Sequence, residues 1–143
     1  MSDKPVFDGV NLVVTDMEAT VAFYRRLGIT IPDQGVWDNH HRTAEAPAGF
    51  DFDFDSTGFA AQWNRGWPGS RGRGGAVFGF KVATRDAVDR VHADMTAAGY
   101  ASQQEPYDAF WGARYAVVED PDGNAVGIMS PMDDAHRSTP PAV

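Results

Sequence analysis

The chain has 143 residues and a formal net charge of −8, and 43% of its residues are hydrophobic, as in ordinary globular proteins. This length suits one domain, and the negative charge would repel the phosphate backbone of nucleic acids. The absence of cysteine excludes disulfides, thiolate catalysis and cysteine-ligated metals. The sequence shows no long apolar run, and we expect its first residues to lead into a strand, not to form a signal peptide. We therefore expect a cytoplasmic protein with neither nucleic acid nor membrane as a partner.

The first regular pattern is a strand that leads into a helix. Apolar residues alternate along residues 9–14, which is the period of a half-buried strand. Thr15 and Glu18 have the spacing of a capping box and predict a helix over residues 17–27. Gly28 supplies the left-handed stop at the end of that helix.

Two strand-like runs follow the first helix. Residues 41–46 and 50–55 flank Pro47-Ala48-Gly49, a sequence that predicts a hairpin. Along the second run, phenylalanine alternates with aspartate. The phenylalanines should therefore pack beneath the helix and turn the aspartates to the opposite face. We expect water around Asp55, and either water or a pocket around Asp51 and Asp53.

The same pattern of strand, helix and glycine returns after a linker, residues 65–74, that is rich in glycine and arginine. Phe78, Phe80 and Val82 alternate along a strand, and Thr84 is a candidate cap for a helix that ends before Gly99. The two strand-to-helix junctions lie about half the chain apart, which indicates a duplicated module.

A second hairpin closes the repeat. Residues 114–119 and 124–129 flank Asp120-Pro121-Asp122-Gly123. In this turn, proline fixes its own φ angle and Gly123 can adopt the positive φ that leads back into the sheet. The residues after the hairpin, 133–143, are rich in proline and charge and are predicted to be disordered.

These elements predict an α+β fold in a single domain, residues 1–132, built from two βαβββ modules. Module one covers about residues 6–64, and module two covers about 75–131. We expect the modules to form a paired, strongly curved sheet of mixed and antiparallel strands, with helices on its outer face. Paired concave sheets would enclose a pocket.

The segments VNLVVTDMEATVAFYRRLGI and FWGARYAVVEDPDGNAVGI resemble the vicinal oxygen chelate superfamily. This superfamily includes glyoxalase I, extradiol dioxygenases and the bleomycin-binding resistance proteins. The resemblance extends over about residues 6–131 and implies the paired-module fold. One such scaffold supports several chemistries as well as pure binding, so the resemblance by itself leaves the activity open.

The resemblance also implies where a metal would bind. Metal-dependent members hold a divalent ion with four histidine or carboxylate side chains, one from each of four strands. The corresponding positions here are Gly9, Asp51, Val77 and Gly127, and only Asp51 has a donor atom. One carboxylate cannot hold a catalytic ion against water, so we expect no metal and no other cofactor.

Enzymatic activity remains the alternative hypothesis. His40 and His41 open a strand and have two interpretations, as a metal pair or as a base, whereas His92 is expected on the surface of its helix. A metal-dependent lyase, isomerase or dioxygenase would use His40, His41, Asp51 or Glu119. A third possibility is a domain that acts through dimerisation or protein contact.

Aromatic side chains supply the signal for binding. They provide stacking area, although ordinary packing would explain any one of them. Asn11, on an otherwise apolar strand, is either a structural amide or a polar anchor. We predict a homodimer that binds a small aromatic or hydrophobic molecule, which can carry a positive charge, without a metal. The resemblance implies that it would sequester this molecule, as the antibiotic-binding resistance proteins of the superfamily do. The candidate ligand-binding residues are Asn11, Trp37, Asp51, Asp53, Trp63, Tyr107, Phe110, Trp111 and Arg114.

Overall fold

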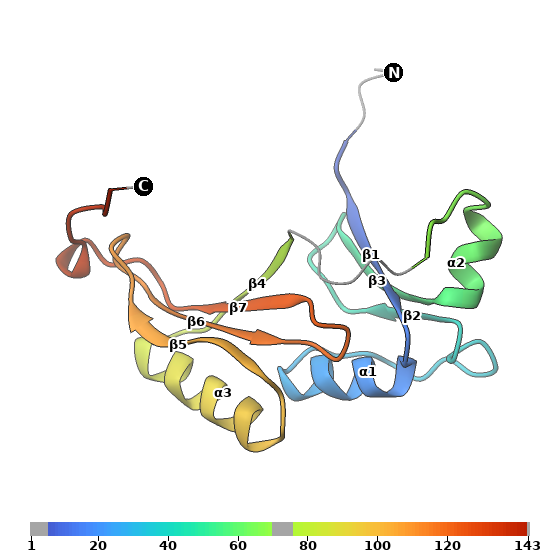
Figure 1. Ribbon diagram of the computed structural model, residues 1–143, viewed down its shortest axis with the longest axis horizontal. Helices are drawn as coiled ribbons and strands as arrows, with labels where there is room; N and C mark the ends of the chain where they lie inside the picture. Colours follow the sequence, from blue (N-terminus) through green and yellow to red (C-terminus); the bar gives the residue numbers. More distant parts are fainter. Residues whose placement is uncertain (1–5, 70–75, 143) are drawn as a thin grey trace. The chain divides into compact units, whose positions relative to one another are not determined.

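The computed structural model describes residues 6–69 and 76–142. The chain divides into two compact units, Met1–Arg71 (unit 1) and Gly72–Val143 (unit 2). This boundary falls within the predicted linker, of which residues 70–74 lie outside the described ranges. Figure 1 shows one long helix along a face of each unit's sheet. The α+β class is confirmed.

The described residues of unit 1 form three strands and two helices. They are β1 (Gly9–Val14), α1 (Met17–Arg26), β2 (His41–Ala44), β3 (Asp51–Ser56) and α2 (Thr57–Trp63). The strand order is β1-β3-β2, with β3 parallel to β1 and antiparallel to β2. The hairpin predicted around Pro47-Ala48-Gly49 is confirmed.

The two faces of β3 divide as its alternation predicts. The rings of Phe52 and Phe54 lie 5.5 and 5.2 Å from the ring of Tyr24 on α1, so the phenylalanines face that helix. In the register, Asn11 lies opposite Asp53, and His41 lies opposite Asp55. The face of the sheet that turns away from α1 is therefore polar.

The start of α1 differs from its prediction. Asp16, and not Thr15, is the N-cap residue, and its Oδ1 accepts a hydrogen bond of 3.0 Å from the amide of Ala19. Aspartate and threonine both cap well, so the sequence offers two adjacent starts. The capping-box prediction for Thr15 and Glu18 is wrong by one residue. Gly28 does adopt the left-handed conformation, with φ of 103°.

Between residues 6 and 69, unit 1 has one strand fewer than the predicted module and one additional helix. Residues 29–32 form no regular strand, although the Thr30 carbonyl accepts a hydrogen bond from the Glu45 amide. Pro32 cannot donate to a ladder, which weakens strand formation there. The unpredicted helix α2 follows β3 and is capped by the hydroxyl of Ser56, which accepts from the Phe59 amide.

Unit 2 has the complete βαβββ order. Its elements are β4 (Val77–Lys81), α3 (Arg85–Ala97), β5 (Ser102–Asp108), β6 (Arg114–Glu119) and β7 (Ala125–Met129). The strand order is β4-β7-β6-β5, in which only β4 and β7 are parallel. Thr84 caps α3 as predicted, and the hairpin between β6 and β7 is also confirmed.

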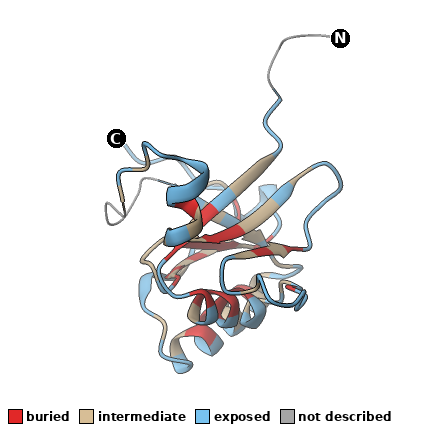
Figure 2. Ribbon diagram, turned by 90° about the vertical axis from the view of Figure 1, so that its right-hand side faces the viewer, coloured by how far each residue is buried: buried red, intermediate tan, exposed pale blue. Residues whose placement is uncertain are grey.

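Each unit buries apolar residues between its sheet and its long helix, and the helices are buried on one side and exposed on the other (Figure 2). Phe23, Tyr24 and Phe54 are fully buried in unit 1, as are Met95 and Ile128 in unit 2. Burial of this kind supplies the main driving force for folding. No helix within the described residues is both long and apolar enough to cross a membrane.

Two expectations for unit 2 are overturned. His92 was expected on the surface but is only 9% exposed, and its Nε2 lies 2.7 Å from the Ser102 hydroxyl. The segment from Asp133 was expected to be disordered. Instead it forms a 3-10 helix, η1 (Asp134–His136), and the Asp133 amide donates to the Gly112 carbonyl. Only Val143 of this segment lies outside the described residues.

Candidate functional site

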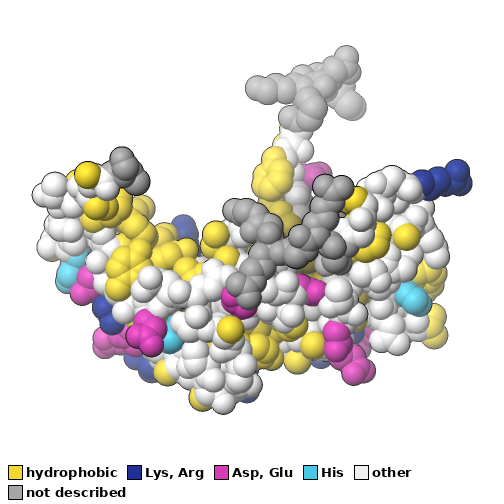
Figure 3. All heavy atoms as spheres, in the orientation of Figure 1, with side chains coloured by type: hydrophobic (Ala, Val, Ile, Leu, Met, Phe, Trp, Pro, Cys, Tyr) yellow, Lys and Arg dark blue, Asp and Glu magenta, His cyan; other side chains and the backbone are white. Residues whose placement is uncertain are grey.

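Four aromatic side chains of unit 2 form a cluster, which we call the aromatic surface: Tyr107, Phe110, Trp111 and Tyr115. The ring of Trp111 lies 5.2 Å from Phe110 and 5.7 Å from Tyr115, both nearly edge-on. Rings in edge contact leave part of their faces available to a further ring. Figure 3 shows hydrophobic side chains gathered beside the C-terminal segment of unit 2.

The position of Tyr115 follows from the pleat of β6. Ala116 and Val118 are fully buried, whereas Tyr115 points to the other face of the sheet. A Cβ atom on Gly127 would lie only 2.5 Å from the Tyr115 hydroxyl oxygen. The absence of a side chain on Gly127 therefore lets the tyrosine ring lie across β7.

The hydroxyl of Tyr115 remains protonated at neutral pH. Burial, and to a smaller extent the neighbouring Tyr107, raise the pKa of Tyr115 above its usual value. The aromatic surface thus combines apolar rings with a hydrogen-bond donor.

Arg114 lies on the opposite face from Tyr115 and is engaged elsewhere. Its guanidinium donates to Asp89 of α3 at 3.0 Å and to Asp108 at 3.1 Å. Hydrogen bonds from Arg85 and Arg114 lower the pKa of Asp108, and the bond to Asp89 raises the pKa of Arg114. Arg114 therefore connects β6 to α3 and β5, and the structure does not bring it together with the aromatic rings.

The polar face of unit 1 is built around Asp55, which is only 1% exposed. Its Oδ2 accepts a hydrogen bond of 2.7 Å from Asn11, and its Oδ1 lies 2.5 Å from Nδ1 of His41. The expectation that water surrounds Asp55 is wrong, because a buried carboxylate is stable only with partners. Asn11 on an apolar strand was the available signal, and its amide donates to this carboxylate while the residue stays exposed.

The other two aspartates of β3 are less constrained. Asp51 is exposed, and Asp53 is half-buried. The Oδ1 atom of Asp53 is inaccessible to solvent and makes no hydrogen bond with the described residues. Such an atom is costly unless a ligand or water donates to it, so Asp53 remains a candidate contact.

The two predicted tryptophans of unit 1 lie beyond this polar face. Trp37 is 57% exposed and packs edge-on against His40 and Phe59, beside a small cavity of about 120 Å³. Trp63 ends α2 and is 50% exposed. The ring of Phe59 also packs against His41, so Trp37 borders the polar face through Phe59.

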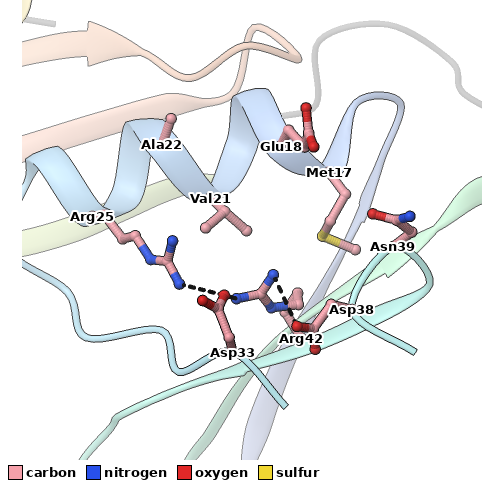
Figure 4. Close-up of a pocket in the computed structure, with 9 residues that line it drawn as sticks. All are labelled: Met17, Glu18, Val21, Ala22, Arg25, Asp33, Asp38, Asn39 and Arg42. Carbon is pink, nitrogen blue, oxygen red and sulfur yellow. Dashed lines mark hydrogen bonds and ion pairs between the residues drawn. The ribbon is translucent and has the colours of Figure 1, made fainter. Parts of the chain in front are cut away.

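A cavity of about 330 Å³ lies between α1 and the loop before β2 (Figure 4). Asp33 bridges two cations there, at 3.1 Å from Arg25 and 2.8 Å from Arg42, and these two arginines lower the pKa of Asp33. Asp38 lies 3.7 Å from Arg42. Because both guanidinium groups already have carboxylate partners, this cluster fastens the loop to α1. Sequence reasoning missed it, since the spacing of these charges shows no motif.

The residues present do not fit the metal set that the resemblance implies. Gly9 is the register partner of Asp51 and offers no donor, and Gly127 pairs with another glycine, Gly79. Across the described ranges, no three histidine or carboxylate side chains gather as metal ligands do. We therefore derive no chemistry through a metal.

The sequence profile of the Glyoxalase/Bleomycin resistance protein/Dioxygenase superfamily matches residues 6–128. Together with the two mixed sheets and their covering helices, this match defines the class of protein. The chain belongs to the Glyoxalase/Bleomycin resistance protein/Dioxygenase superfamily. No curated protein matches the chain.

Several solved structures share the fold. A glyoxalase-related enzyme from Fulvimarina pelagi has a TM-score of 0.74 at 18% identity, with 87% of this chain and 86% of that chain covered. A hypothetical protein from S. aureus has a TM-score of 0.73 at 20% identity, with 92% and 95% covered. A glyoxalase/bleomycin resistance protein/dioxygenase family enzyme from Burkholderia phytofirmans has a TM-score of 0.71 at 21% identity, with 88% and 98% covered. At these identities the likeness concerns the fold alone.

Proposed function

We propose that this protein binds a small, planar aromatic or hydrophobic molecule without a metal, at the aromatic surface of unit 2. The contact that carries the proposal is the edge-on cluster of Trp111 and Tyr115 above the bare backbone of Gly127. Gly127 lets the Tyr115 ring lie flat on the sheet beside Trp111, and the exposed parts of these rings offer a flat ligand surfaces on which to stack. Sequestration of a drug-like molecule, as in the resistance proteins of the superfamily, is the form of function we favour.

The chemistry of the rings defines the preferred ligand. Stacking on a well-placed ring contributes about 0.5–1.5 kcal/mol beyond simple burial. Tyrosine and tryptophan faces also attract cations, and the net charge of −8 favours a cationic ligand over an anionic one. The Tyr115 hydroxyl would donate a hydrogen bond to an acceptor on the ligand. We therefore expect planar cations to bind most tightly, planar neutral molecules less tightly, and planar anions weakly.

Isothermal titration with three probes tests this proposal: aminoacridine as a planar cation, naphthol as a neutral molecule and naphthalenesulfonate as an anion. We expect Trp111→Ala to weaken aminoacridine binding by about tenfold, the loss of one good ring contact. The control is Trp63→Ala, which removes another exposed tryptophan from unit 1. Absence of binding by all three probes, or equal effects of the two variants, would overturn the proposal.

Metal analysis of the untagged protein tests the alternative. One equivalent of nickel, zinc, manganese or iron per chain would instead support a metal-dependent lyase, isomerase or dioxygenase.

A further inference from the structure

The carboxylate of Asp55 holds the imidazole of His41 in a defined orientation. Asp55 is buried, and the Asn11 amide occupies its second oxygen at 2.7 Å. Its first oxygen lies 2.5 Å from His41 Nδ1. A carboxylate can only accept, so Nδ1 carries the proton of the neutral ring. The other ring nitrogen, Nε2, then bears the free electron pair.

The surroundings leave Nε2 of His41 available. The His41 side chain is 36% exposed, whereas that of its partner Asp55 is 2% exposed. The ring of Phe59 packs edge-on against the imidazole at 5.9 Å. The hydroxyl of Thr43 lies 3.3 Å from Nε2, a long hydrogen bond that an incoming group can replace. A buried carboxylate behind an accessible imidazole is the arrangement by which proteins orient a histidine base.

A possible contact for a substrate lies on the same face of the sheet. In the register, Asp53 sits between Asn11 of β1 and Thr43 of β2. Its buried Oδ1 has no hydrogen-bond partner among the described residues. Because this oxygen is inaccessible to solvent, it accepts from a substrate hydroxyl or amine only when the half-buried Asp53 side chain turns outward. The carboxylates of Asp51 and Asp53 would repel an anion, so the matching molecule is neutral or cationic.

We propose that His41 is a metal-independent general base, acting through Nε2 on a small neutral or cationic molecule that carries a weakly acidic C–H and a hydroxyl or amine. The proton moves from carbon to Nε2, and the electron pair of the broken bond stays on the substrate. Nε2 then returns the proton to another atom of the same molecule, so the step needs no co-reactant. Asp55 is a positioning residue that balances the charge on the imidazole. This activity in unit 1 goes beyond binding at the aromatic surface and is independent of it.

The proposal is tested first with a probe that requires only a base, nitrobenzisoxazole. Removal of its ring C–H proton breaks the N–O bond and releases a coloured phenolate. General-base catalysis typically contributes a factor of about 100 or more. We expect His41→Gln to lower the rate of the probe reaction, corrected for the reaction in buffer, by at least about tenfold, because glutamine has no basic nitrogen. The glutamine amide can still donate to Asp55, so the buried carboxylate keeps a partner.

The matched control is His136→Gln. His136 also pairs with an aspartate, Asp133, at 3.1 Å, but both of these side chains are about half exposed. We expect this variant to keep the full rate. Equal rates for the wild-type protein and His41→Gln would overturn the proposal.

A second measurement does not depend on the probe or on the folding of a variant. Nitrogen NMR of the wild-type protein should show neutral His41 protonated at Nδ1. A third test returns to the probe: Asp55→Asn should lose that preference and lower kcat more than it raises KM. Protonation of neutral His41 at Nε2 would contradict the proposal even if the protein accelerates the reaction.

Discussion

Gly127 on β7 provides the space in which the ring of Tyr115 lies. A methyl group there would meet the Tyr115 hydroxyl oxygen at 2.5 Å and two ring carbons at 3.0 Å, all closer than normal contacts. Gly79, its register partner on β4, has open space above it. Two adjacent glycines on one face therefore have different roles, and a sequence cannot distinguish them.

We predict that Gly127→Ala displaces the Tyr115 ring and weakens aminoacridine binding several-fold. The free energy of unfolding should change less than the free energy of binding does. The reason is that the clash falls on the far end of a side chain that can swing away. Titration calorimetry would measure the weaker binding, and near-ultraviolet circular dichroism would report the displacement of the tyrosine ring. Gly79→Ala is the control and should leave both unchanged. If the two variants behave alike, the ring does not depend on Gly127.

At the scale of elements, the C-terminal segment is attached to unit 2 by backbone contacts. The Asp133 amide donates to the Gly112 carbonyl, and the Ser138 amide donates to the Phe110 carbonyl, both at 3.0 Å. Phe110 also belongs to the aromatic surface, so η1 and the segment after it support the loop that carries this ring. The sequence predicts no such role, because proline and charge are typical of disordered tails.

We predict that Gly112→Ala detaches this segment. Gly112 has φ of +94°, and a Cβ atom there would clash with the Asp133 carbonyl oxygen. The control is Gly99→Ala, which imposes the same backbone strain at φ of +97° but meets open space. Strain alone costs about 1–2 kcal/mol, and Gly112→Ala should cost more. Urea denaturation and faster hydrogen exchange of the Ser138 amide would show this. Equal costs would mean that the contact is unimportant.

At the scale of the whole molecule, acidic residues exceed basic ones, yet many arginines are held in ion pairs. Asp108 illustrates how these pairs depend on pH. Its pKa in the folded protein is lowered from the usual value of about 3.8 by Arg85 and Arg114. A lowered pKa means that the folded state holds the ionised form more tightly than the unfolded state does. The stabilisation is therefore complete above the unfolded pKa and is lost as the pH falls through the folded one.

We predict that Asp108→Asn lowers the free energy of unfolding at neutral pH and that this effect disappears in acid, once the pH has fallen below the lowered pKa of Asp108 in the folded protein. The control, Glu105→Gln, removes a carboxylate of the same strand that has no side-chain bond with the described residues. The effect should also shrink in about 1 M salt, because Asp108 is exposed. Urea denaturation across the pH range would test this. An effect of Asp108→Asn that persists in acid would exclude the ion pairs as its cause.

Alternating apolar residues predicted most strands, capping residues and stop glycines predicted both long helices, and turn residues predicted both hairpins. Together they gave the α+β class, since each of these signals depends on neighbours in sequence. The missing strand of unit 1 and the extra helix α2 were not predicted, because short segments depend on what they pack against. Three rings of the aromatic surface, Tyr107, Phe110 and Trp111, were among the candidate residues, but Tyr115 was not. The engagement of Arg114 with α3 was not anticipated, because its partner Asp89 is distant along the chain.

The sequence by itself determined the repeated pattern, the superfamily and the lack of donor atoms at the expected metal positions, because these follow from residue types and local spacing. Only the tertiary structure decided that Asp55 is buried with His41 and Asn11, that Gly127 lies beneath Tyr115, and that the C-terminal segment folds back on Gly112. Each of these contacts joins residues from different elements of the chain. Whether a polar side chain such as that of Asp55 faces water or a protein partner is decided only when the strands pair.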